Sequence, residues 1–195
     1  AMENLGIFGK SFQENLCKFL LFDRSFCDQM EEVLDTGFFE LKYLQVFTEK
    51  LFKYRKQYGV HPTNDILTSI FRTELEDENL VLQKQVRDFF ARIRASNEIE
   101  DKEYIQTTAL DFCKKQVLKE AILKSVPLLK RSSFEDVQKL INEAIKNVGL
   151  SPNQNFILIA IGNKSHQIKL FESILFPSSL SRILSKPFSE ASLSA

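Results

Sequence analysis

One stripe of apolar residues constrains this chain more than any other feature. Its members recur at three- and four-residue steps, which places them on one face of an amphipathic helix: Phe134, Val137, Leu140, Ile141, Ala144, Ile145 and Val148. Ser132 and Glu135 form the capping-box pattern that begins a helix, and Gly149 stands where a left-handed C-cap ends one. The sequence therefore predicts a well-bounded helix between these signals.

A second amphipathic segment precedes this stripe and begins near Asp101. We expect it to kink or weaken around Pro127, because a proline ring clashes with the carbonyl four residues back. Together the two segments predict a helical hairpin over residues 101–149. A helical hairpin carries no chemistry by itself; it presents a surface to another chain.

The rest of the chain predicts an all-α head followed by an atypical tail. Five amphipathic segments fill residues 11–100, ending near Phe22, Leu34, Tyr58, Phe71 and Ala95. No stretch between residues 11 and 149 alternates with period two, as a half-buried strand would. Residues 150–195 contain an apolar run and a Ser/Pro-rich end, and we expect a partly disordered linker or tail there.

Composition excludes several classes of function. The 195 residues include 26 basic and 26 acidic side chains, so no overall positive field gathers nucleic acid, and DNA binding is expected to be weak at most. No apolar run reaches the roughly 20 residues that span a bilayer. Three widely separated cysteines, Cys17, Cys27 and Cys113, predict free thiols in a reducing compartment, and we expect a cytoplasmic protein.

Taken in order, several segments resemble the N-terminal domain of DnaB-type replicative DNA helicases. The first helix with its aspartate turn (13–23), the aromatic pair leading into a long helix (34–51) and the glycine-to-proline loop (59–67) carry the resemblance. The hairpin adds Lys102-Glu103-Tyr104-Ile105, Lys114-Lys115-Gln116-Val117-Leu118 and Phe134-Glu135-Asp136-Val137. The resemblance covers roughly residues 11–149; the long, charged 79–95 segment, Pro127 and the tail depart from the family's pattern.

The resemblance implies a non-catalytic module that forms the collar of a helicase ring. It implies self-association as a dimer or a trimer of dimers, docking of a primase or helicase loader, and an ATPase site in a separate domain. The implied partner-facing surface lies on the hairpin and comprises Tyr104, Phe112, Leu118, Ile122, Phe134, Val137, Leu140, Ile141 and Ile145. No catalytic residue, cofactor or metal ligand is predicted.

Candidate chemistry in the sequence is weak. Gly162-Asn163-Lys164-Ser165 follows an apolar run, but Leu158 and Asn163 occupy the two glycine positions of a P-loop, so we predict a turn and no ATP binding. His61 and His166 lack the spacing of metal ligands. The acidic run from Glu74 to Glu78 lacks the alternating ligands and central glycine of a calcium loop and predicts a solvated break.

A basic stretch within the fifth segment leaves two interpretations open. Lys84, Arg87, Arg92 and Arg94 surround Phe89 and Phe90, a combination that can hold single-stranded nucleic acid. The same rings fit the apolar stripe of an ordinary amphipathic helix, which is the favoured interpretation.

Two alternatives to the helicase module follow from the same residues. One is a free-standing helical adaptor, such as a phage regulator that binds the replicative helicase or primase; the reading frame beyond Ala195 would distinguish the two. The other is an enzyme with an unrecognised site, which the lack of any nucleophile, paired-carboxylate or metal pattern disfavours.

Overall fold

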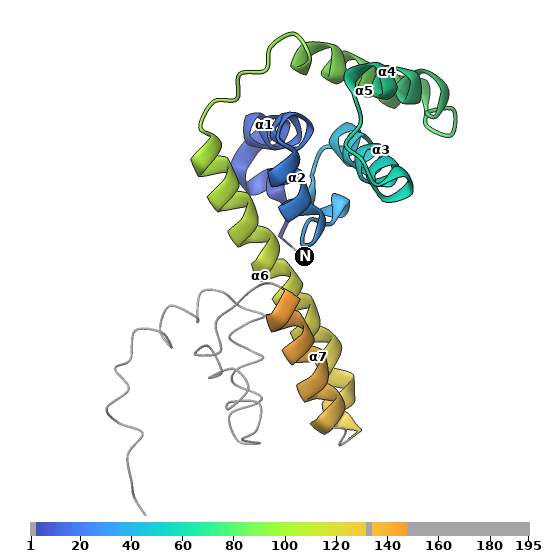
Figure 1. The fold of residues 1–195 in the computed structure, drawn as a ribbon. Coiled ribbons are helices and arrows are strands. Elements are labelled where there is room, and N and C mark those ends of the chain that lie inside the picture. Colours follow the sequence, from blue (N-terminus) through green and yellow to red (C-terminus); the bar gives the residue numbers. More distant parts are fainter. Residues whose placement is uncertain (1–2, 132–133, 148–195) are drawn as a thin grey trace, which may run out of the picture. The chain divides into compact units, whose positions relative to one another are not determined.

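A computed structural model describes residues 3–131 and 134–147 of the chain. Within these residues there are seven α-helices, two short 3₁₀ helices and no strand, which confirms the predicted all-α fold of a helical head followed by a helical hairpin (Figure 1). The elements are η1 (Leu5–Phe8), α1 (Gly9–Phe22), α2 (Arg24–Glu31), η2 (Thr36–Phe38), α3 (Lys42–Tyr58), α4 (Asn64–Thr73), α5 (Leu80–Ile93), α6 (Lys102–Lys130) and α7 (Phe134–Asn147).

Local sequence signals set most of the helix ends. Thr63 accepts a hydrogen bond from the Ile66 amide at 3.3 Å and Asn79 one from the Leu82 amide at 2.9 Å, which caps α4 and α5. At the end of α3, Gly59 adopts the left-handed conformation with φ 70°, which a residue with a Cβ rarely adopts.

Asp23 caps α2 and accepts the hydrogen bond from the Phe26 amide at 2.9 Å. The predicted capping-box Ser132, the C-cap Gly149 and the whole 150–195 tail lie outside the described residues.

The chain divides into two compact units, and the division falls inside α6 after Lys114. Unit 1 contains α1 to α5 and the N-terminal half of α6, whereas the predicted head ended at residue 100. Unit 2 contains the C-terminal half of α6 and all of α7, which folds back beside it (Figure 1). Pro127 lies inside α6, and the helix continues past it to Lys130.

Phenylalanine rings join three helices of unit 1. Phe47 of α3 is completely buried, and its ring centroid lies 5.4 Å from Phe71 of α4. Two rings of α5 complete the cluster: Phe89 lies 5.2 Å from Phe47 in an edge-to-face arrangement, and Phe90 lies 5.2 Å from Phe71. Such ring pairs add attraction to the burial of apolar area and need no polar partner. Packing between these rings therefore holds α4 and α5 against α3.

A second ring cluster holds the N-terminal half of α6 in unit 1. The Phe112 ring meets Phe8 and Phe38 edge-on, each at 5.8 Å, and only 5% of Phe112 is exposed. Phe112 belongs to the predicted partner face and is buried within this unit. A ring that η1 and η2 of the same unit already cover has no surface left for another chain.

We expect Phe47→Ala to lower the free energy of unfolding by about 4 kcal/mol, because it removes the ring shared by α3, α4 and α5 and leaves a cavity. Tyr58→Ala is the matched control on the same helix, since Tyr58 is 58% exposed and should change stability by less than about 1 kcal/mol. Urea unfolding followed by circular dichroism measures both. Equal losses would contradict a core centred on Phe47.

Candidate interaction surfaces and the buried polar centre

The structure distributes the predicted partner-face residues over both units. In unit 1, Tyr104 is 60% exposed and touches the Phe12 ring edge-on at 6.2 Å, whereas Phe112 is buried. In unit 2, Phe134 at the start of α7 is 47% exposed. Leu118, Leu140 and Ile145 are half-buried, and Ile122, Val137 and Ile141 are buried. The predicted residues therefore do not form one continuous exposed face.

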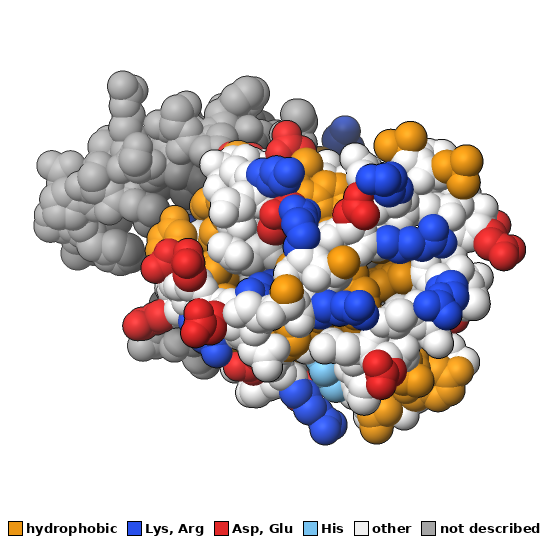
Figure 2. Space-filling model, turned by 90° about the horizontal axis from the view of Figure 1, so that it is seen from above, with side chains coloured by type: hydrophobic (Ala, Val, Ile, Leu, Met, Phe, Trp, Pro, Cys, Tyr) orange, Lys and Arg blue, Asp and Glu red, His pale blue; other side chains and the backbone are white. Residues whose placement is uncertain are grey.

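The structure supports the interpretation of the basic stretch of α5 as part of an ordinary amphipathic helix. Phe89 and Phe90 are buried in the ring cluster, so neither ring presents a face on which a base could stack. Lys84 pairs with Asp88 at 2.9 Å, and Arg92 pairs with Glu14 at 2.9 Å. Figure 2 looks down on the end of unit 1 that carries α4 and α5, and shows Lys and Arg side chains spread over it with apolar patches between them.

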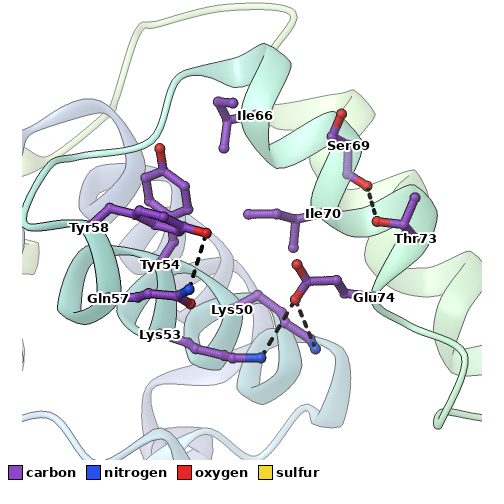
Figure 3. A pocket seen from close by; sticks show the side chains of 10 residues that line it. All are labelled: Lys50, Lys53, Tyr54, Gln57, Tyr58, Ile66, Ser69, Ile70, Thr73 and Glu74. Atoms are coloured by element: carbon purple, nitrogen blue, oxygen red, sulfur yellow. Dashed lines mark hydrogen bonds and ion pairs between the residues drawn. The ribbon is translucent and has the colours of Figure 1, made fainter.

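A shallow groove lies between α3 and α4 (Figure 3). The Tyr54 and Tyr58 rings form one side with their centroids 4.7 Å apart, and Ile66 faces them from α4. At the other end, Glu74 lies 3.8 Å from Lys50 and 3.7 Å from Lys53, so this residue of the acidic run is paired. The groove of about 170 Å³ combines exposed aromatic and aliphatic side chains with two lysines that share one glutamate, a composition suited to protein contact.

Arg55, in the last turn of α3, is the centre of a polar network that the sequence did not single out. Its guanidinium is largely buried and donates to Glu31 at 2.8 and 3.1 Å, to Asp28, and to His61 Nδ1 at 2.6 Å. The carboxylates come from α2, and the histidine comes from the loop after α3. The only sequence signal was an arginine on the apolar side of α3, which periodicity alone does not mark as special.

His61 has both ring nitrogens occupied. Nε2 donates to the Leu21 carbonyl at 2.5 Å, one of the last-turn carbonyls of α1 that lack a helical partner, and Nδ1 accepts from Arg55. This pairing requires a neutral ring. Burial lowers the pKa of His61 below its usual value, and the nearby Arg55 charge lowers it further. The network joins α1, α2 and α3, and no lone pair of His61 is free to act as a base.

The three cysteines do not carry reactive thiols. Cys17, Cys27 and Cys113 are free and buried, which agrees with the predicted role as small apolar side chains. Burial raises the pKa of Cys27 to about 12 and that of Cys113 to about 12, and it raises the pKa of Cys17 as well. A thiol reacts as its thiolate, so these sulfurs are inert at neutral pH.

The part of the chain that the structure describes holds no cluster of histidine, cysteine and carboxylate side chains able to bind a metal ion. None of its helices is long and apolar enough to cross a membrane. His166 and the incomplete P-loop at residues 162–165 lie outside that part.

Comparisons with known proteins identify no relative. No family model, no curated protein and no solved structure matches the chain. The likeness to the helicase domain therefore depends on the residues quoted above.

We expect the pH dependence of stability between pH 7.5 and 5.5 to reveal His61. The folded state holds the ring neutral, whereas the unfolded ring has a pKa of about 6.5, so stability present at pH 7.5 is lost as the pH falls through that value. In His61→Gln the amide can donate to Leu21 and accept from Arg55 without titrating. Thermal unfolding should show a steeper decline for the parent than for the variant; parallel declines would contradict a neutral His61.

Proposed function

We propose that this chain is a non-catalytic oligomerisation and partner-docking module of a replicative DNA helicase. It would form part of the collar of the ring and dock a primase or helicase loader in the cytoplasm. The observation that carries the proposal is the helical hairpin that follows an all-α head, with apolar side chains left at its surface. This is the architecture that the resemblance implied.

Two further observations support a binding role over a catalytic one. The titratable centre of unit 1 is fully paired: Arg55 contacts two carboxylates and His61, whose second nitrogen meets a backbone carbonyl. The thiols are buried and protonated. A catalytic base or nucleophile needs a free lone pair within reach of a substrate, and these groups offer none.

The hairpin retains apolar area that an oligomer would bury. Phe134 is exposed at the start of α7, and Leu118 of α6 and Leu140 of α7 are half-buried. A helix pair in water gains roughly 25 cal/mol for each Å² of such surface that a second copy covers. We therefore assign the self-association surface to the hairpin around Phe134, Leu118 and Leu140.

We expect the full chain at tens of micromolar to have a mass in light scattering well above the 22.6 kDa monomer. Phe134→Glu should shift it toward the monomer, because a charge at an exposed apolar contact is costly to desolvate. Leu80→Glu is the control: Leu80 is 80% exposed and lies in unit 1. A strictly monomeric parent, or equal shifts for both variants, would contradict the self-association surface.

The partner role has a separate test. We expect the full chain to retain a cognate primase or helicase in a pull-down from the source cell, identified by mass spectrometry against bait-free beads. Reconstitution with the purified primase should reproduce the complex. A self-associating chain that binds neither protein would remove the replication role while leaving the oligomerisation role intact.

A further inference from the structure

A pocket of about 210 Å³ on α4 and α5 gathers three arginines: Arg72, Arg87 and Arg94. All three side chains belong to exposed residues, and Thr68 lies among them. Phe71, Phe90 and Ala91 supply its apolar lining. No aspartate or glutamate lines this arginine pocket.

Two guanidinium groups of the arginine pocket, those of Arg87 and Arg94, are held in place without being neutralised. Arg87 Nε donates to the Phe71 carbonyl at 2.8 Å, and its Nη2 donates to the Gln83 amide oxygen at 3.3 Å. Arg94 Nη1 donates to the Thr68 hydroxyl at 3.2 Å, and its guanidinium carbon lies 5.6 Å from the centre of the Phe90 ring. These acceptors are neutral.

The contrast with the neighbouring cations is informative. Lys84 and Arg92, on the same helix, each pair with a carboxylate, whereas among the described residues none of the three pocket arginines makes an ion pair. Three uncompensated charges around one hollow raise the local concentration of anions. Arginines fixed by neutral groups keep further N–H donors for a carboxylate or a phosphate.

The apolar surroundings distinguish between these two anions. Phe71 and Phe90 are 2% and 4% exposed, so their rings cannot accept a stacked base, which is the usual complement to phosphate contacts in single-stranded nucleic acid. Leu80 is 80% exposed and stands seven residues before Arg87, which itself stands seven before Arg94. Seven residues span about two helical turns, or roughly 10 Å. Leu80, Arg87 and Arg94 therefore lie along one face of α5.

We propose that the arginine pocket binds an acidic peptide segment of a partner protein, with two carboxylates engaging Arg87 and Arg94 and an apolar side chain covering Leu80. Arg72 reinforces the positive charge from α4. A helical segment with acidic residues seven positions apart matches the spacing of the arginines along α5. The site belongs to unit 1, whereas the self-association surface is assigned to unit 2, so the two assignments can be tested independently.

The test uses the full chain and a fluorescein-labelled helical peptide of about 15 residues with one Leu and two Glu at seven-residue intervals. We expect saturable binding by fluorescence anisotropy at low salt, weakened by added salt and abolished when both Glu are replaced by Gln. Arg72→Gln with Arg94→Gln should weaken binding by roughly tenfold, because it removes the ion pair with Arg94 and the positive charge that Arg72 adds. Both residues are exposed, so the variant should fold.

Two controls make the result specific. Lys10→Gln with Arg92→Gln removes the same charge from the cations beside Glu14 and should leave the affinity unchanged. Arg72→Glu with Arg94→Glu should reject the acidic peptide and bind its Lys counterpart. Equal binding of the Glu and Gln peptides, or equal weakening by the control variant, would overturn the proposal. A labelled single-stranded oligonucleotide that binds more tightly than the peptide would overturn it in favour of nucleic acid.

Discussion

Ring packing around Phe47 is the interaction on which unit 1 depends. One fully buried phenylalanine of α3 contacts rings from α4 and α5, so three consecutive helices share one contact point. The chain has 18 phenylalanines and no tryptophan, and a phenylalanine core needs no hydrogen-bond partner inside the protein. The polar networks of this unit therefore lie outside the ring core, at the helix ends and at the surface.

The Arg55–His61 network complements the ring core by joining the remaining helices. Arg55 of α3 binds two carboxylates of α2. His61 contacts Arg55 and hydrogen-bonds to the last turn of α1. Removing Glu31 or His61 would leave the largely buried Arg55 guanidinium short of a partner, which costs more than the net attraction of the pair suggests. Apolar rings therefore position α3, α4 and α5, and a polar network positions α1, α2 and α3.

These constraints determine which surfaces remain for other molecules. Phe112 is buried in unit 1, and Ile122, Val137 and Ile141 of the predicted partner face are buried as well, whereas Phe134 is 47% exposed. The Phe89 and Phe90 rings of α5 also pack inside the unit. The arginines near them therefore remain at the surface without an aromatic ring on which a nucleic-acid base could stack. In both places packing decides which side chains can meet a partner.

Periodicity and capping chemistry in the sequence determined the helix types, most helix ends and the hairpin, because these depend on side chains within about four residues of one another. The apolar stripe of α7 and the end of α3 at Gly59 were both predicted in this way. Only the tertiary structure decided that Phe112 is covered, that Arg55 and His61 share one network, and that three arginines of α4 and α5 surround one pocket. Those features join residues from different helices, and a pattern with a period of 3.6 says which face a side chain occupies but not which element covers it.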